Sequence, residues 1–546
     1  MKRYMEHLIR SAEKRVDHFL NIQVTDEKDL FYGGMKSGIL EAKPTIYVMA
    51  DAASVYLNQN SRYYKNENLL TAMEAAVSFI ANCQRDDGSF DYPSCNFKSA
   101  PDTSFCFKRL IATYRLFINY TKEGELNRLK EGYHFLLVKS LNALLTGGFH
   151  TPNHRWGITA ALMQGASLVK EENPKLGKEL LKRAEQYLAE GIDGNEEGEY
   201  AERSTGNYNA VVNNAMMAMY EETGDETYLL YVNRNLKMML FYIDPDDTIF
   251  TQNSTRQDQG KAEYPDKYFY QYLYMAAKTK EEVYDRAAHK IIKDNMERGD
   301  MAPECLHIIM LHDFMEQYQF KGYGFLETYH KHFKEAGVIR GKTKEYGYSI
   351  LKGKREFLFL KFDETLVYLK IGESYCDIRN FIPQTMEETK DGVVLTSKAK
   401  GWYYLPFKEK QDTKDWWKMD HKKRDILNSS EIDLTVTVKE CLKGVEVTVK
   451  AEGLDRVPLR VELCVPAGSI LENEQFHLKA AKGEELILRD GFVTLHHKEQ
   501  NLILGPGFGT HEFGGHYSGE VLNEAGYTIY FNDYSPYERT FSIRRV

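Results

Sequence analysis

The sequence lacks any run of about 18 consecutive apolar residues, so it predicts no membrane-spanning helix. Its first twenty residues, MKRYMEHLIRSAEKRVDHFL, mix charged and apolar positions and lack the unbroken apolar core of a signal peptide. Cysteine is scarce: 7 among 546 residues, scattered and without a CxxC pair, which favours free thiols in a reducing compartment. We therefore expect a cytoplasmic protein, or an extracellular one if a leader has been removed.

Positive charge is not in excess. The chain has 71 Lys and Arg against 80 Asp and Glu, a net charge of -9, which makes nucleic acid and anionic membranes poor partners. A glycine-rich phosphate loop, a dinucleotide fingerprint and a serine nucleophile elbow are missing too. His496 and His497 would point to opposite faces of a strand. We expect no required metal and no cofactor.

What the sequence does contain is two stretches with different hydrophobic periods. Up to about residue 335, apolar residues recur three and four apart, which predicts about thirteen helices in successive hairpins, the last two over 303–318 and 322–335. From about residue 346 the period becomes two, as in GVEVTVKA (444–451), which predicts antiparallel strands. The expected fold is an N-terminal α/α toroid over residues 1–337 and a C-terminal antiparallel β-sandwich over 338–546.

An amide, an imidazole, a guanidinium and an indole follow one another in TPNHRWG, residues 151–157, where a helix is expected to begin. Asn is a preferred N-cap, so the simplest interpretation makes Asn153 a cap and His154 a surface neighbour. Two polar loops, DGNEEGEYAERSTGNYN (193–209) and TQNSTRQDQGKAEYPDKY (251–268), favour a larger role. If hairpins alternate around a toroid, these loops lie on one rim, where helix N-termini favour an anion.

The helices followed by strands, the Asn–His pair and the DG…E.S.G.Y loop resemble the heparinase II/III-like polysaccharide lyases, which include oligoalginate lyases. QNSTRQDQG and NFKSAPDTSF are similar to segments of the rhamnose–glucuronate lyases. The specific motifs cover only residues 147–210. The resemblance implies an incomplete α/α toroid with a β-sandwich and β-elimination at a uronic acid. In that reaction a base removes the C5 proton, an acid protonates the departing C4 oxygen, and the neighbouring carboxylate must be neutralised.

The resemblance implies catalytic roles for three residues. Asn153 would neutralise the carboxylate, His154 would share in neutralisation or abstract the proton, and Tyr208 would protonate the leaving oxygen. Arg256 is added on physical grounds, as a guanidinium fork for a carboxylate. The expected substrate-binding residues are Arg155, Trp156, Glu202, Arg203, Asn207, Asn253 and Gln257, of which Trp156 is more suited to packing beneath the site.

The chain departs from the family at two points. Asn207 stands where many members have a second Tyr, and the later His that members often use is not singled out by the sequence. The candidates for that residue are His307, His312, His421, His511 and His516.

Two other functional classes stay open. A glycoside hydrolase removing unsaturated uronates needs two placed carboxylates, which Asp102, Asp193, Glu202 and Asp258 offer. A non-catalytic glycan-binding protein would need only an aromatic rim, to which the 37 Tyr residues could contribute. In each case the expected partner is an acidic oligosaccharide or polysaccharide, with a homodimer left open.

Overall fold

The computed structural model describes residues 1–36, 38–512 and 523–546, and the chain divides into two compact units. The helical unit comprises Met1–Tyr242 and Thr248–Leu326, and the strand unit comprises Ile243–Asp247 and Glu327–Val546. The units thus divide at 326/327, where the sequence placed the boundary at 337/338. The loop at 243–247 joins the strands because Asp244 accepts a hydrogen bond from Arg340 at 2.6 Å and Asp246 pairs with Lys361 at 2.9 Å.

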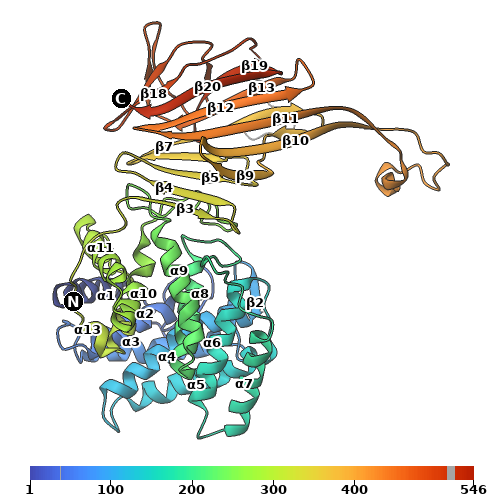
Figure 1. Cartoon of the computed structure of the whole chain (residues 1–546). Coiled ribbons are helices and arrows are strands. Elements are labelled where there is room, and N and C mark those ends of the chain that lie inside the picture. The colour runs from blue at the N-terminus through green and yellow to red at the C-terminus, as the bar shows by residue number, and fades with distance from the viewer. Residues whose placement is uncertain (37, 513–522) are drawn as a thin grey trace. The chain divides into compact units, whose positions relative to one another are not determined.

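The helical unit is built from helical hairpins (Figure 1). Its helices are α1 (Lys2–Ile22), α2 (Lys43–Leu57), α3 (Glu67–Cys83), α4 (Ala100–Tyr120), α5 (Asn127–Thr146), α6 (Pro152–Leu168), α7 (Pro174–Leu188), α8 (Tyr208–Thr223), α9 (Glu226–Leu240), η1 (Pro265–Tyr268), α10 (Phe269–Thr279), α11 (Glu282–Arg298), α12 (Leu306–Met310) and α13 (Asp313–Glu316). A short hairpin of β1 (Phe90–Tyr92) and β2 (Asn96–Ser99) precedes α4. No helix among the described residues is both long and apolar enough to cross a membrane.

The helices form an inner and an outer layer. Helices α2, α4, α6 and α8 pack side by side, α12 packs between α2 and α4, and α3, α5 and α7 lie outside them. Burial follows this arrangement: α2 is buried along nearly its whole length, whereas α7 buries only Gly177, Leu180, Ala184 and Tyr187, spaced three and four apart. Helices α4 and α6 approach closely at Gly157, where a Cβ would lie 2.9 Å from the Ser104 hydroxyl. This is the expected α/α toroid architecture.

The end of the helical region differs from the sequence expectation. The helix expected over 303–318 is replaced by the short helices α12 and α13. The helix expected over 322–335 is wrong, because its second half forms strand β3 (Tyr329–Phe333). Gly322 and Gly324 weaken a helix here, and Gly324 adopts a φ of +126°, outside the helical region.

The strand unit contains two nine-stranded sheets over the described residues. Their strands are β3, β4 (Val338–Lys342), β5 (Gly347–Leu351), β6 (Leu358–Phe362), β7 (Thr365–Tyr375), β8 (Ile378–Asn380), β9 (Thr385–Thr389), β10 (Gly392–Tyr404), β11 (Ile426–Cys441), β12 (Gly444–Gly453), β13 (Pro458–Pro466), β14 (Ile470–Glu472), β15 (His477–Lys479), β16 (Glu485–Ile487), β17 (Val493–His497), β18 (Gln500–Gly505), β19 (Gly526–Tyr534) and β20 (Tyr537–Arg545). Described strand pairs are antiparallel except β16 with β19.

The two sheets share one apolar core. Leu369 and Leu463 from one sheet and Val436 and Val447 from the other are completely buried in the same cluster. Alternation along β11 and β12 puts every second side chain into this core, which is why the period-two pattern predicted them. The expected antiparallel β-sandwich is confirmed. Strands β10 and β20 were not predicted, because their solvent faces carry charged and polar residues that dilute the apolar pattern.

Candidate active site

The TPNHRWG motif opens helix α6, but Asn153 is not the cap. The helix begins at Pro152, and Thr151 occupies the N-cap position. Proline is favoured at the first helical position because its missing N–H would be unpaired there anyway. Asn153 therefore lies inside the first turn, and its Nδ2 donates to both carboxylate oxygens of Glu202, at 3.0 and 2.8 Å. The TPNHRWG motif is thus joined to the 193–209 loop by a hydrogen-bonded pair.

Glu202 also contacts Arg256, which in turn lies against the ring of Tyr208. The Arg256 Nε lies 3.4 Å from the Glu202 Oε1, and the Arg256 guanidinium carbon lies 5.0 Å from the centre of the Tyr208 ring. The Tyr208 hydroxyl donates to the Gln257 Oε1 at 3.3 Å. Burial raises the pKa of the Glu202 carboxyl, and its hydrogen bond from Asn153 and the charge of Arg256 oppose that shift. Asn153, Glu202, Arg256, Tyr208 and Gln257 therefore form one connected cluster.

Asp258 holds the two loops of this cluster together. Its carboxylate accepts hydrogen bonds from the Ser204 hydroxyl at 2.9 Å, the Ser254 hydroxyl at 2.6 Å and the Gly206 amide at 2.9 Å. Ser204 in turn accepts from the Tyr208 backbone amide at 2.9 Å, at the start of α8. Several charge-assisted bonds to one buried carboxylate make a rigid base for the Tyr208 side chain.

His154 lies beside the cluster between two rings. The centre of its imidazole is 4.8 Å from that of His150 and 5.8 Å from that of Phe105, both in edge contacts. Its Nδ1 is buried and makes no hydrogen bond with any residue the structure describes. Burial, followed by the neighbouring His150, lowers the pKa of His154 to about 4, so the ring is neutral near pH 7. A neutral imidazole can accept a proton but does not neutralise a carboxylate.

Three candidates are buried. The burial of Trp156 agrees with its expected packing beneath the site, and the expected substrate contacts of Asn153 and Asn253 stay predictions. Asn153 and Trp156 have no exposed surface, and Asn253 has 2%. The Trp156 Nε1 donates to Asp193, and the Asn253 Nδ2 donates to the Glu199 carboxylate at 3.1 Å. Both polar groups are used to hold the 193–209 loop. Asn153 likewise donates to Glu202 through its Nδ2 and orients that carboxylate, while its buried Oδ1 makes no hydrogen bond with a described residue.

The other candidates are tied to neighbouring protein groups. Their partners are Glu190 and Asp193 for Arg155 (2.7 and 3.2 Å), Glu199 for Arg203 (3.5 Å) and Lys267 for Asn207 (3.2 Å). These contacts show what holds each side chain. Their expected roles toward a substrate stay predictions.

The later catalytic histidine is still unassigned. His307 is buried against Arg109, His312 pairs with Glu221 at 2.6 Å, and His421 contacts the carbonyl of Trp416 at 2.8 Å. His511 lies 3.3 Å from the carbonyl of Asp533. His307 and His312 make no hydrogen bond with the residues of this cluster, His421 and His511 belong to the strand unit, and His516 lies outside the described residues.

Two neighbours of His154 were not singled out by sequence reasoning, Phe105 and Lys43. The Lys43 Nζ lies 5.4 Å from the Phe105 ring centre and 3.5 Å from the Asp102 carboxylate. Phe105 is the last residue of NFKSAPDTSF (96–105), a segment already noted for its similarity to the rhamnose–glucuronate lyases. Lys43 is the first residue of helix α2 and is followed by Pro44. The Lys-Pro pair marks a helix start in the sequence, but nothing local points to a role beside His154.

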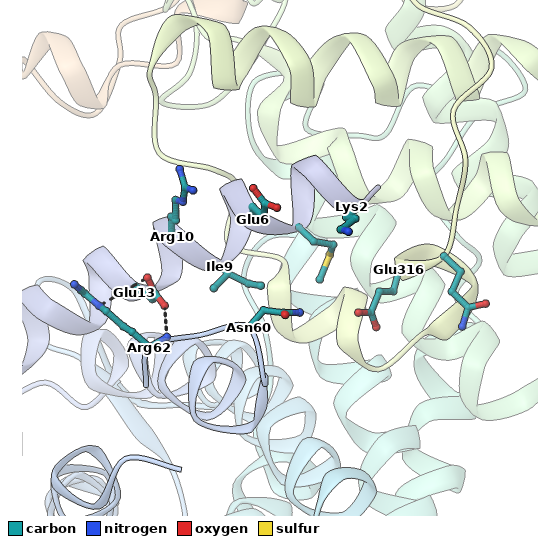
Figure 2. A pocket seen from close by; sticks show the side chains of 10 residues that line it. Lys2, Glu6, Ile9, Arg10, Glu13, Asn60, Arg62 and Glu316 are labelled. Carbon is teal, nitrogen blue, oxygen red and sulfur yellow. Dashed lines mark hydrogen bonds and ion pairs between the residues drawn. The ribbon is translucent and has the colours of Figure 1, made fainter. Parts of the chain in front are cut away.

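A separate hollow of about 800 Å³ lies along α1 and beside α13 (Figure 2). Its charges are mixed, and Arg62 donates its backbone amide to Glu13 at 2.9 Å and lies 3.8 Å from the same carboxylate through Nε. The side chain of Arg62 is 57% exposed. Paired, hydrated charges of this kind offer little to an anionic ligand, so this hollow is not the candidate site.

Comparison with solved structures identifies the fold. The chain is similar to a xanthan lyase from Paenibacillus (TM-score 0.58, 8% identity), covering 100% of this chain and 57% of that one. It is also similar to heparinase III (TM-score 0.58, 11% identity, 99% and 85% covered) and to a variant of the chondroitin AC lyase of Streptomyces coelicolor A3 (TM-score 0.54, 10% identity, 100% and 80% covered). No family model and no curated protein matches the sequence. The chain has the α/α toroid plus β-sandwich fold of polysaccharide lyases.

Proposed function

We propose that this protein is a polysaccharide or oligosaccharide lyase that cleaves a glycosidic bond at a uronic acid by β-elimination. The observation that carries the proposal is the connected cluster of Tyr208, Arg256, Glu202 and Asn153 at the N-terminal ends of α6 and α8. It brings a phenol and a guanidinium together within a polysaccharide lyase fold. These are the two groups that β-elimination needs for a leaving oxygen and a carboxylate.

Arg256 is the group best suited to neutralise the uronate carboxylate. Its terminal nitrogens make no hydrogen bond with any described residue, while Glu202 lies on the Nε side. That arrangement leaves the outer edge of the guanidinium for a bidentate pair with a carboxylate. Glu202 holds the guanidinium in place, and Asn153 holds Glu202. The neutralising role expected of Asn153 is thus assigned to Arg256, with Asn153 as a positioning residue.

The two proton transfers are assigned to His154 and Tyr208. The neutral His154 takes the C5 proton, the electrons of the C5–H bond form the C4–C5 double bond, and the C4–O bond breaks. The Tyr208 hydroxyl donates its proton to the departing oxygen. Solvent then returns a proton from His154 to the Tyr208 phenolate, so the balance closes over one turnover. In a second route Tyr208 performs both transfers, and His154 only shapes the site.

Hydrolysis is the weaker proposal because the four candidate carboxylates are engaged. Their partners are Ser99 and Asn96 for Asp102, Trp156 and Arg155 for Asp193, Asn153 for Glu202, and Ser204, Ser254 and Gly206 for Asp258. A hydrolase needs one carboxylic acid and one carboxylate turned toward the sugar. Each of these four carboxylates is already bound by protein groups, so no two of them form such a pair.

The proposed substrate is a glycan containing glucuronate or a related uronate, with a rhamnose–glucuronate glycan as the first candidate. The test is incubation with a panel of uronate glycans, following the ultraviolet absorbance of a new C4–C5 double bond. Cleavage with new absorbance supports the lyase. Cleavage without it overturns the proposal, and loss of absorbance from an already unsaturated uronate indicates a hydrolase. Binding without cleavage across the panel indicates a glycan-binding protein.

A further inference from the structure

A small cavity of about 110 Å³ lies inside the helical unit, away from the cluster of Tyr208 and Arg256. Side chains from α4, α6, α8, α10 and α12 line it, among them Lys108, Gln164, Asn214, Tyr270 and His307. A narrower hollow lined by Phe105 and Gly157 shares Lys108 and Gln164 with it. The cavity therefore lies deeper along the inner helices whose first turns carry the candidate active site.

Three hydrogen-bond donors at this cavity have no acceptor. Lys108 forms no ion pair or hydrogen bond with any residue in the described ranges. Gln164 is only 6% exposed and likewise forms no hydrogen bond with a described residue. The Nε of Arg109 is buried and without a partner. Lys108 is partly exposed, whereas the Arg109 Nε is a fully buried donor, and buried donors are nearly always hydrogen-bonded. The cavity therefore offers donors that an acceptor entering it can use.

The other charges around the cavity are already paired. Their pairs are Glu221 with His312 at 2.6 Å, Arg115 with Glu222 at 2.6 Å and Arg109 with Glu304 at 3.3 Å. Lys108 therefore contributes a positive charge that no described carboxylate balances. A partly exposed amine of this kind is stabilised in its charged form when an anion enters the cavity beside it.

We propose that this cavity binds a small oxyanion, such as a carboxylate or a tetrahedral oxyanion, through Lys108 and Gln164, with Arg109 beside them. The size supports a small ligand, because the cavity is below the ~150 Å³ that admits benzene. Apolar ligands are disfavoured by the amine and amide that face the space. The site shares no residue with the cluster of Tyr208, Arg256, Glu202 and Asn153, so it stands independently of the proposed lyase function.

The titration of Lys108 agrees with this geometry. Burial, followed by the charges of Arg109 and Lys43, lowers the pKa of Lys108 to about 7. The remaining charged or titratable groups that line the cavity are Arg115 on α4, Glu221 on α8, Tyr270 on α10, Glu304 before α12, His307 on α12 and His312 before α13. A bound anion favours the protonated amine. Affinity is thus expected to fall as pH rises above about 7 and to level off below it.

The first experiment measures the binding of sulfate and of acetate by calorimetry, each with the whole protein. We expect Lys108→Met to weaken binding by about tenfold or more, because a charge-assisted hydrogen bond is lost. Wild-type affinity should fall by about tenfold per pH unit at most between about pH 7 and 8.5. Tighter binding of acetate or of sulfate shows which oxyanion geometry the site takes. The exposed Lys178 on α7 supplies a matched control, Lys178→Met, expected to bind as wild type.

The second experiment locates the anion and separates it from the candidate active site. Crystals soaked in selenate should show an anomalous peak beside Lys108, and Arg256→Met should keep that peak. Equal affinities of wild type and Lys108→Met, or a peak only at Arg256, would overturn the proposal without affecting the lyase assignment. If Lys108→Met does not fold, Gln164→Leu provides the same comparison, with an expected loss of about threefold to tenfold. Unchanged binding in that variant also overturns the proposal.

Discussion

Charged side chains are used differently in the helical unit and the strand unit. In the strand unit, two pairs of buried charges face each other: Arg340 donates to Asp244 at 2.6 Å, and Lys370 pairs with Glu462 at 2.8 Å. In the helical unit, the cluster at the starts of α6 and α8 is paired only on its inner side. The terminal nitrogens of Arg256 make no hydrogen bond with a described residue. Paired buried charges maintain a structure, whereas a charge with one open side can meet a ligand.

The difference has a structural cause. Strands in a sheet satisfy their backbone groups on neighbouring strands, and a buried charge between them is held by an opposite charge, as at Arg340 and Lys370. Helix N-termini leave backbone N–H groups unpaired, and the loops that precede them gather polar side chains. When hairpins alternate, several such loops meet. The four predictions below test this contrast, from the largest expected effect to the smallest.

The largest effect is expected at Tyr208. Tyr208→Phe removes the proposed proton donor and should lower kcat by about 10²–10⁴-fold, with little change in stability because its hydroxyl makes a single hydrogen bond with the described residues, to Gln257. The measurement is the rate of double-bond formation beside a thermal melt. Tyr264→Phe is the control, because Tyr264 is 40% exposed and lies in the 251–268 loop that also carries Arg256. Near wild-type turnover in Tyr208→Phe would refute the assigned acid.

Arg256 should come next. Arg256→Met removes the proposed carboxylate fork and should lower kcat/KM by about 10²–10³-fold, the usual cost of losing one charge-stabilising donor. Arg256→Lys keeps the positive charge but loses the two-pronged guanidinium, so its kcat/KM should lie between those of Arg256→Met and wild type. Arg234→Met is the control, since Arg234 pairs with the exposed Glu196. An Arg256→Met enzyme that matches this control would show that another group neutralises the substrate.

Arg340 tests the opposite side of the comparison. Arg340→Met leaves Asp244 buried and unpaired, so it should destabilise the strand unit by about 3–5 kcal/mol. Urea unfolding followed by circular dichroism measures this loss. Arg456→Met, which breaks an exposed pair with Asp455, should cost about 0–1 kcal/mol. Equal losses in the two variants would mean that the buried pair does not maintain the sheet.

The smallest effect concerns the pH response of His154. The folded protein holds its pKa at about 4, below the ordinary 6.5, so only the unfolded chain takes up a proton as pH falls between these values. The stability of wild type should therefore decline relative to His154→Gln from pH 6.5 down to about 4. Wild-type activity should show no His154-dependent loss between about pH 7 and 5. An activity midpoint near 6.5 that disappears in His154→Gln would contradict a neutral, low-pKa base.

The sequence predicted most of the helical unit because each helix carries its own hydrophobic period and a short polar loop. Helices α2 to α11 appear where the period placed them. The region at 303–335 failed because its apolar spacing is helical while Gly322 and Gly324 favour an extended chain. Strands β11 and β12 were readable from alternation, whereas β20 was not, because its exposed face breaks the pattern.

The cluster was only partly predictable. Alternating hairpins were enough to expect Tyr208, Arg256 and Glu202 on one rim, and the structure brings them into contact. The state of Asn153 was not predictable, because it depends on a helix that starts one residue earlier, at Pro152, and on a partner 49 residues away. The unpaired Lys108 was beyond sequence reasoning for the same reason.

The sequence by itself determined which segments are helices or strands, which loops carry polar side chains and where the two periods change. These properties follow from local spacing, since a helix or strand buries one face whatever lies opposite. Tertiary structure alone decided which polar groups bind one another and which can still bind a ligand. Hydrogen bonds and ion pairs form within about 4 Å, between residues far apart in the chain, so only the packed fold leaves Arg256 open on one side and buries Asn153.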